Sequence, residues 1–166
     1  VNGKPNPDSD FSDINSELIL SDIATLESIL NRVTKSKNSD KEKNILKDEI
    51  SNALDKLNNS NFLDKADLDK VKEFFPDIKM LTQKPMFVIA NVNENTSREE
   101  IEKFKRHLSK NITVVEVDVK TETDLNELSN DEKIEFMTEF NIMEPALSKI
   151  IKTGYGLLDL KTFFFK

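Results

Sequence analysis

The sequence predicts an α/β fold that carries an antiparallel helical hairpin, and two patterns indicate this class. In the C-terminal half, two apolar stretches of strand length, residues 86–90 and 112–119, flank a segment with helical spacing. Strand, helix and strand in that order form a βαβ unit, which builds parallel sheets. In the N-terminal half, two segments carry apolar residues at alternating spacings of four and three, which places those residues on one stripe of a helix.

Composition narrows the class of protein further. The 166 residues suffice for one domain, or for one compact unit with a helical appendage. A net charge of −7 argues against a general nucleic-acid surface, because phosphates require concentrated Lys and Arg. The absence of cysteine excludes disulfides and thiolate metal sites and favours a cytoplasmic location. We expect no membrane partner, since no apolar run reaches the ~18 residues of a spanning helix and the start lacks the pattern of a signal peptide.

The N-terminal half is expected to begin with a lead-in loop over residues 1–11 and to continue as a helix from Ser12. A capping box of Ser39 with Glu42 predicts the start of a second helix. The apolar stripes of the two helices are Ile19, Ile23, Leu26, Leu30 and Val33, then Leu46, Ile50, Ala53 and Leu57. The short polar turn between them predicts a helical hairpin. Its narrow stripes suggest a projecting, mobile arm over residues 12–80; the alternative is that both stripes join one globular core.

The remaining elements follow in order. A short helix is expected to end near Pro76, because proline disfavours helical geometry in the residue before it. After the strand at 86–90, Thr96 with Glu99 predicts the capping box of the next helix, and Ser129 with Glu132 that of a later one. A last helix is predicted over residues 145–158, and residues 160–166, with Phe163–Phe165, read as another extended segment.

Two strands alone make an incomplete sheet. A parallel sheet is normally covered on both faces and has several strands, and a two-stranded one leaves long apolar edges open. We therefore expect this chain to be part of a larger α/β sheet, an expectation that the missing initiator Met also favours.

Polar side chains follow both predicted strands at the point where each strand ends. Asn91, Asn93 and Glu94 follow the first strand, and Asp118–Glu122 follow the second. In open α/β sheets, ligands bind beyond the carboxyl ends of the strands, so these two loops could face one ligand. The alternative is that Asn91–Asn95 only forms a turn and caps the next helix, as such residues often do.

Other candidate chemistry is sparse. His107, the only histidine, falls beside Lys103 on the polar face of its helix, so we expect a surface residue and no metal site. Acidic residues follow helix-surface patterns, and no catalytic residue is predicted. The three glycines, Gly3, Gly154 and Gly156, cannot form the G-x-x-x-x-G-K-[ST] loop that cradles phosphates.

Four segments, in order along the chain, resemble one family. "DFSDINSEL" (10–18) resembles the D-I-x-x-I-N-x-E-L segment of the YchF family, the Obg-like ATPases of the P-loop GTPase superfamily. "LTQKPMFVIANVNE" (81–94) resembles its L-T-x-K-P-x-x-Y-x-A-N-V-x-E, and "VVEVDVKTETDLNELSNDEKIEFM" (114–137) resembles its V-V-P-V-S-A-K-x-E-A-E-L and the acidic helix that follows. "EPALSKIIKTGYGLLDLKTFFF" (144–165) resembles its E-P-G-L-x-x-L-I-x-x-x-Y-x-L-L-G-L-x-T-F-F.

The resemblance implies a fragment. In YchF-like proteins the phosphate loop and switch regions precede the segment that resembles residues 10–18, and a TGS domain follows the point where this chain stops. The expected fold class is therefore the base-binding half of a P-loop GTPase-type parallel sheet domain, residues 81–166, with an inserted antiparallel, coiled-coil-like hairpin. Catalysis would belong to the absent loops, so this chain alone should hydrolyse nothing and hold no nucleotide tightly.

The resemblance also assigns a base-binding site. Most GTPases read guanine with N-K-x-D, whereas the family resembled here carries N-x-x-E, present as Asn91, Val92, Asn93 and Glu94. The longer Glu94 side chain cannot keep the aspartate geometry for guanine, which favours ATP over GTP. The second loop places Asp118 and Val119 where the family has a Ser-Ala pair, followed by Lys120. The implied base-binding residues are Asn91, Val92, Glu94, Asp118, Val119 and Lys120.

The expected function is that of part of a YchF-type protein that binds and slowly hydrolyses ATP, or GTP, with Mg²⁺, and that is linked to ribosomes and translation. The alternative is a non-enzymatic interaction module whose hairpin docks on a protein, the ribosome or RNA. A modest basic tip on the hairpin could contact RNA phosphates: Lys35, Lys37, Lys41, Lys43 and Lys47. Alternating acids make solubility the more ordinary reason for these lysines. The oligomeric state is left open.

Overall fold

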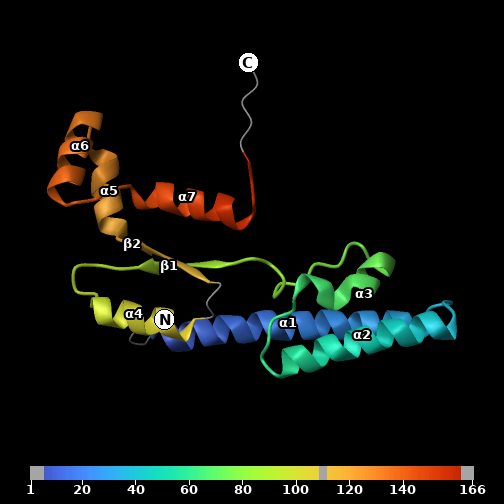
Figure 1. The fold of residues 1–166 in the computed structure, drawn as a ribbon. Coiled ribbons are helices and arrows are strands. Elements are labelled where there is room, and N and C mark those ends of the chain that lie inside the picture. The colour runs from blue at the N-terminus through green and yellow to red at the C-terminus, as the bar shows by residue number, and fades with distance from the viewer. Residues whose placement is uncertain (1–5, 109–111, 162–166) are drawn as a thin grey trace, which may run out of the picture. The chain divides into compact units, whose positions relative to one another are not determined.

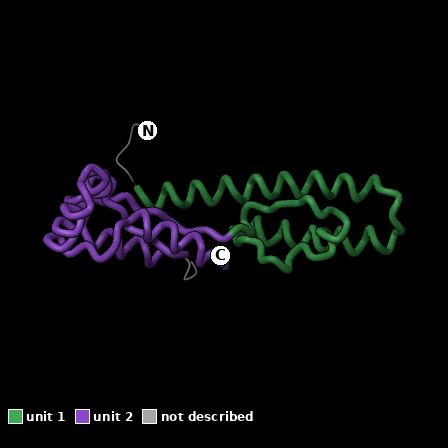
Figure 2. Tube along the Cα trace, turned by 90° about the horizontal axis from the view of Figure 1, so that it is seen from above, with its two compact units in different colours: residues 1–84 green, residues 85–166 purple. Residues whose placement is uncertain are grey.

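The computed structural model describes residues 6–108 and 112–161. The chain divides into two compact units, residues 1–84 and residues 85–166, which are coloured separately in Figure 2. Each unit is described by itself. The predicted extended segment with Phe163–Phe165 lies outside the described residues.

Unit 1 is helical, with α1 (Pro7–Lys35), α2 (Asp40–Asn58), the 3₁₀ turn η1 (Lys65–Leu68) and α3 (Asp69–Phe74) (Figure 1). The expected start of α1 at Ser12 is wrong, because residues 7–11 are already helical. Asn6 caps the helix by accepting a hydrogen bond from the Ser9 N–H at 3.3 Å. Pro7 stands at a first-turn position, where its missing N–H has no cost. Asp8 and Asp10 add negative charge where the helix dipole favours it.

The predicted capping box at the start of α2 is present. The Ser39 N–H donates to Glu42 Oε2 at 2.9 Å, and the Glu42 N–H donates to Ser39 Oγ at 3.3 Å. Two backbone donors that have no partner within the helix are thereby satisfied. Hydrogen bonds from the Ser39 side chain and backbone also lower the pKa of Glu42, because they stabilise its charged form.

The two predicted stripes of unit 1 meet in one core. The most deeply buried members of the stripes are Leu26, Val33, Leu46, Ile50, Ala53 and Leu57. The core also takes residues from η1, α3 and the connecting segments: Leu63, Leu68, Val71 and Met80. The hairpin is therefore not a bare pair of helices. Residues 60–80 close its open side, so the helices bury more apolar surface than two narrow stripes alone would allow.

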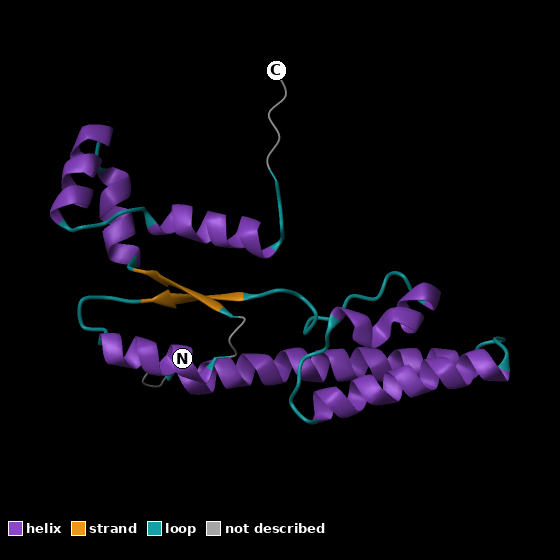
Figure 3. Ribbon diagram, in the orientation of Figure 1, coloured by secondary structure: helices purple, strands orange, loops and turns teal. Residues whose placement is uncertain are grey.

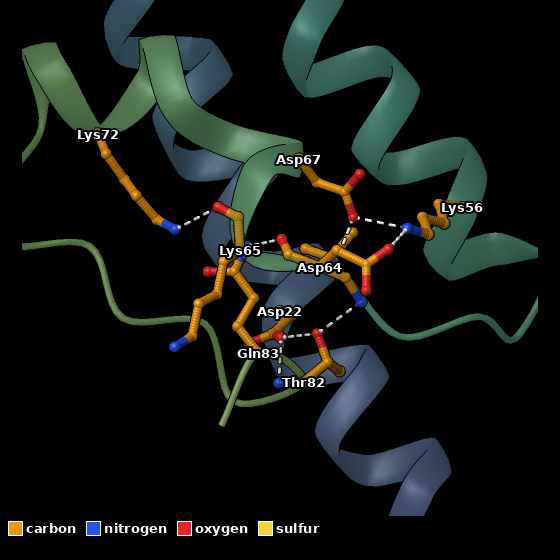
Figure 4. A network of polar contacts seen from close by, with 9 residues as sticks. Asp22, Lys56, Asp64, Lys65, Asp67, Lys72, Thr82 and Gln83 are labelled. Carbon is orange, nitrogen blue, oxygen red and sulfur yellow. Dashed lines mark hydrogen bonds and ion pairs between the residues drawn. The ribbon is translucent and has the colours of Figure 1, made fainter. Parts of the chain in front are cut away.

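A polar network fastens the last segment of unit 1 to α1 (Figure 4). Asp22 is 1% exposed, and it accepts hydrogen bonds from the Leu81 N–H at 2.7 Å and the Thr82 N–H at 2.8 Å. The Thr82 hydroxyl donates to the same carboxylate at 2.7 Å. This buried charge is thus met by three donors, which a buried carboxylate requires if it is not to destabilise the fold.

Lys56 forms a second part of this network, closer to solvent. Its ammonium lies 2.7 Å from Asp64 Oδ2 and 2.8 Å from Asp67 Oδ2 (Figure 4). The hydrogen bonds to Asp64 and Asp67 raise the pKa of Lys56. Burial raises the pKa of Asp67, but the hydrogen bonds from Lys56 and from the Asp64 backbone outweigh burial, so the net shift is downward. These two ion pairs connect the start of η1 to α2.

Unit 2 contains β1 (Phe87–Asn91), α4 (Arg98–His107), β2 (Thr113–Val117), α5 (Val119–Glu127), α6 (Asn130–Glu139) and α7 (Ala146–Leu157) (Figure 3). The two strands are parallel, and Phe87 stands opposite Thr113 and Asn91 opposite Val117. The predicted βαβ unit is therefore present. Phe87, Val115 and Val117 pack on one face of the sheet with Ala146 and Ile150 of α7.

The other face of the sheet is linked to α4. Because side chains alternate along a strand, Glu116 points away from the side of Val115 and Val117. Lys105 of α4 contacts Glu116 at 2.6 Å and Glu102 at 3.0 Å, and these hydrogen bonds raise the pKa of Lys105. Glu116 thus has a structural partner in α4.

Three predicted boundaries in unit 2 can be compared with the structure. Two of them differ from the prediction and one agrees with it. The second strand ends at Val117 rather than Val119, because Asp118 caps α5 and ends the extended conformation. The helix cap predicted for Thr96 with Glu99 is wrong by one position: Ser97 and Glu100 form the capping box of α4. The predicted box of Ser129 with Glu132 is present at α6, and it lowers the pKa of Glu132.

Within residues 6–108 and 112–161, none of the helices is both long enough and apolar enough to span a bilayer.

Candidate functional site

The predicted site lies at the carboxyl edge of the two-stranded sheet. The parallel register brings Asn91, the last residue of β1, opposite Val117, the last residue of β2. The pairing extends one residue further, because the Val92 N–H donates to the Val117 carbonyl at 2.9 Å. Asn91 therefore ends β1, one residue later than the predicted strand end at Ala90, and Asp118 follows the end of β2. The structure brings the two polar loops to the same edge.

The loop after β1 is a hydrogen-bonded turn built on Asn93. The Asn93 side chain accepts from the Asn95 N–H at 2.9 Å and from the Thr96 hydroxyl at 3.2 Å. The Asn93 N–H donates to Thr96 Oγ1 at 3.0 Å. Thr96 is therefore occupied within the turn, which explains why the helix cap moves to Ser97. Asn91 lies two residues before the Asn93–Thr96 turn and Glu94 lies within it, and both residues are exposed.

The loop after β2 is short because α5 starts at once. Asp118 Oδ1 accepts hydrogen bonds from the Lys120 N–H at 3.0 Å and the Thr121 N–H at 3.2 Å. Its carboxylate is thus engaged with the helix N-terminus, where negative charge is favoured. Val119 is 52% exposed and Lys120 is exposed, and both lie in the first turn of α5. The sequence placed these residues in a loop; the structure places them on a helix.

One residue near this edge was not singled out from the sequence. Glu122 of α5 accepts hydrogen bonds from the Ala146 N–H at 2.5 Å and the Leu147 N–H at 3.5 Å. It therefore caps α7 from a distance of more than twenty residues along the chain, and no local pattern predicts such a contact. A cavity of about 300 Å³ borders Asp118, Thr121, Glu122 and Lys149. Neither Asn91 nor Glu94 lines it.

Metal and acid–base chemistry have few candidates in this unit. In the part of the chain that the structure describes, no three His, Cys, Asp or Glu side chains lie close enough together to hold a metal ion. His107 is exposed at the end of α4, where the sequence analysis expected a surface residue. What the edge does offer is hydrogen-bonding chemistry: the exposed amide of Asn91 and the exposed carboxylate of Glu94 are suited to a polar heterocycle.

The fold has a clear structural counterpart. The YchF GTPase of Schizosaccharomyces pombe matches with a TM-score of 0.75, over 95% of this chain and 46% of that chain, at 24% sequence identity. No family model matches the sequence. The chain therefore has an α/β fold of the P-loop GTPase type, and the predicted fold class is confirmed.

Sequence comparison finds relatives of one kind. The chain is 36% identical to the ribosome-binding ATPase YchF of Escherichia coli O157:H7 over 169 residues, and 32% identical to that of Bacillus subtilis over 173 residues. Each match covers 99% of this chain and 47% of the relative. The resemblance to the YchF family is thereby confirmed over nearly the whole chain. The chain spans about half the length of the curated relatives it matches.

Proposed function

We propose that this chain supplies the base-recognition edge and the helical arm of a YchF-type nucleotide-binding protein. The protein binds ATP, with GTP as the weaker alternative, and hydrolyses it slowly in the cytoplasm. Residues 81–166 form the nucleotide half and residues 12–80 the arm. The observation that supports this most is the geometry of the parallel edge, where Asn91 ends β1 and Asp118 follows the adjacent end of β2.

The assigned roles follow from hydrogen-bond chemistry. Glu94 carries an acceptor for the exocyclic amine of adenine, and Asn91 carries both a donor and an acceptor for the ring edge. Val92 is held by its bond to Val117 and sets the position of both neighbours. Asp118 acts by capping α5, which positions Val119 and Lys120 beside the base rather than contacting it through its own carboxylate. The phosphates and their Mg²⁺ are bound by segments other than this chain, since charge stabilisation of phosphates is the work of separate loops in such proteins.

The test is a titration of the intact protein with labelled ATP and GTP. Glu94→Ala should weaken ATP binding about tenfold or more, since a hydrogen bond to a charged group contributes ~1.5–3 kcal/mol. Glu94→Asp should shift the preference towards GTP, because the shorter carboxylate restores the guanine geometry. The matched control is Glu99→Ala, which removes another exposed carboxylate nearby, at the start of α4. Unchanged affinity and selectivity in both Glu94 variants would reject the assignment.

The second candidate function is ribosome docking through the arm. It is supported by the names of the bacterial relatives, which are ribosome-binding ATPases, and by the lysines around the α1–α2 turn. Three of these, Lys35, Lys37 and Lys41, are exposed. Contacts of such lysines to RNA phosphates would release counterions and make binding salt-dependent.

Charge reversal distinguishes this candidate from the nucleotide site. The intact protein with Lys35, Lys37 and Lys41 changed to Glu should lose co-sedimentation with ribosomes and keep its affinity for ATP. A control triple variant at three other exposed lysines, Lys79, Lys84 and Lys103, should co-sediment normally. If the arm variant co-sediments as the control does, the basic tip is not the docking surface.

A further inference from the structure

Helix α6 has an unusual balance of apolar and charged residues. It has no buried residue along its ten positions, although residues 130–143 contain six large apolar side chains. Ile134 is 67% exposed, Phe140 is 59% exposed, and Met143 in the following turn is 98% exposed. We call Phe136, Phe140 and Met143 the α6 patch; Ile134, two positions before Phe136, lies on another side of the helix. In unit 2, α6 follows α5 along the chain (Figure 1).

The α6 patch has a preformed aromatic centre. The rings of Phe136 and Phe140 are stacked, with centroids 4.5 Å apart and planes at 29°. Because these residues are four positions apart, they share one side of the helix. The Phe140 N–H and the Ile142 N–H bond back to Phe136 and Met137, which fixes the turn that carries Met143. The two stacked rings form a rigid apolar surface, and the exposed Met143 side chain adds a flexible apolar group.

The charge around the α6 patch is strongly one-sided. Residues 127–144 contain six acidic residues and a single basic one, Lys133. Asp131, Glu135 and Glu139 are spaced by four, so they line one side of α6, and all three are exposed. The acids flank the apolar side chains along the helix. A surface of this kind repels nucleic acid, and it disfavours pairing with a second copy of itself, because like charges would face each other.

We propose that the α6 patch is a docking surface for a basic amphipathic helix of a partner protein. Apolar side chains of the partner cover Phe136, Phe140 and Met143, which removes exposed apolar area from water. Lysine or arginine side chains on the flanks of the partner helix pair with Asp131, Glu135 and Glu139. Helix-in-groove recognition of this type uses apolar anchors on one face and charges for orientation. The choice of partner rests on charge complementarity; Phe140 also borders the cavity that Asp118 lines.

The probe is a fluorescent amphipathic helical peptide built from Leu and Lys, titrated with the 166-residue chain and followed by anisotropy. A peptide with the same Leu pattern and Glu in place of Lys is the control probe. The Lys peptide should bind and the Glu peptide should not. Binding of the Lys peptide should weaken as salt is added, because exposed charge pairs are screened. Equal binding of both peptides would overturn the charge argument.

Two pairs of variants locate the surface. Phe140→Ala with Met143→Ala should weaken binding about tenfold or more, as truncation of central anchors does. Its control is Ile14→Ala with Leu20→Ala, two side chains of similar exposure on α1, 58% and 59%, and binding should be unchanged. Glu135→Gln with Glu139→Gln should weaken binding severalfold, whereas Asp13→Asn with Glu17→Gln on α1 should not. Circular dichroism confirms that each variant keeps its helices.

Three outcomes would overturn the proposal. Undiminished binding in both α6 variants would place the peptide elsewhere. Concentration-dependent dimerisation that is lost in the Phe140 and Met143 variant would make the patch a contact between copies. Binding to the 166-residue chain but not to the intact protein would mean that another segment of the same protein covers the patch.

Discussion

The two units of this chain differ in how completely they bury their apolar side chains. In unit 1 the eleven core residues are between 0% and 3% exposed, and they come from every helix of the unit. In unit 2 the buried apolar residues are between 4% and 9% exposed, and large side chains such as Ile89, Leu147 and Ile151 are at least half exposed. Unit 1 closes its own core, whereas unit 2 leaves apolar faces on its sheet and on α6 and α7.

The difference shows that similar apolar patterns in the sequence can lead to different degrees of burial. The stripe of α1 and the stripe of α7 both have helical spacing, yet only the first is fully covered within its unit. Unit 1 derives its stability from packing and from the buried carboxylate of Asp22. Unit 2 has capping boxes and surface contacts, such as Lys105 with Glu116, but fewer fully buried side chains. Four predictions test this contrast, from the largest expected effect to the smallest.

Truncating a core side chain of unit 1 should give the largest loss of stability. Ile50→Ala removes a side chain that is fully buried between α1 and α2, so we expect a loss of ~2–5 kcal/mol. The matched change in unit 2, Ile134→Ala, should alter the free energy of unfolding by ~0.5 kcal/mol or less, because the side chain is 67% exposed. Urea unfolding followed by circular dichroism measures both. Similar losses of unfolding free energy in the two variants would mean that the difference in packing between the units does not affect stability.

Removing the buried carboxylate should be the next largest effect. Asp22→Ala leaves the N–H groups of Leu81 and Thr82 without their acceptor, and each unsatisfied buried group costs ~1–3 kcal/mol. Hydrogen exchange at these two amides should accelerate strongly. The control is Asp13→Ala, which removes an exposed carboxylate from the same helix. If both variants unfold at the same urea concentration, the contact does not stabilise the unit.

Breaking the Lys56 ion pairs should have a smaller effect. Lys56→Ala is expected to cost no more than ~1 kcal/mol, because the pairs with Asp64 and Asp67 are partly exposed. The loss should shrink when the unfolding midpoint is measured in high salt, since salt screens such charges. A loss that does not depend on salt would indicate that the aliphatic part of the side chain, not its charge, stabilises η1.

The capping boxes should produce a small acid sensitivity in both units. Their serines lower the pKa of Glu42 in unit 1 and of Glu132 in unit 2. A carboxyl with a lowered pKa in the folded state stabilises the fold above its ordinary pKa, ~4.3. That stabilisation is lost as the pH falls through the lower, folded value. Glu42→Gln and Glu132→Gln should each flatten the decline of stability between neutral and acidic pH.

Two spectroscopic signals can assign the effect of each glutamate variant to its unit. The only tyrosine, Tyr155, lies in α7, and the chain has no tryptophan, so tyrosine fluorescence reports on unit 2. A variant of Glu132 should affect that signal first, and a variant of Glu42 should affect helix content first. An identical response of both variants in both signals would show that the units unfold together.

Local patterns predicted most of the fold because their physical causes are local. The helical stripes and the boxes at Ser39 and Ser129 depend on residues three or four positions apart. The parallel strands were recognised from β-branched runs around a helix. Local patterns failed where two neighbouring residues could have the same role. Thr96 and Ser97 could both cap α4, but Thr96 is hydrogen-bonded to Asn93, so Ser97 is the cap. Asp118 was expected in a loop, but its carboxylate starts α5.

The candidate site was predicted only in part, because local patterns show strand ends but not contacts between distant residues. The sequence placed Asn91 and Asp118 at strand ends, and the parallel register brings those ends side by side. It did not show that the Asp118 carboxylate is bonded within α5, nor that Glu122 caps α7. Whether Asn91 and Glu94 read a base stays a prediction that the titration above decides.

By itself, the sequence determined the helices and strands, their order and the polar character of the sheet edge, since hydrophobic period and end-capping chemistry act within a few residues. Only the tertiary structure decided that Asp22 meets Thr82 across sixty residues, that α7 rather than α6 covers the sheet, and which apolar faces stay exposed. These outcomes depend on contacts between distant segments, where burial and hydrogen-bond satisfaction are settled by the whole fold.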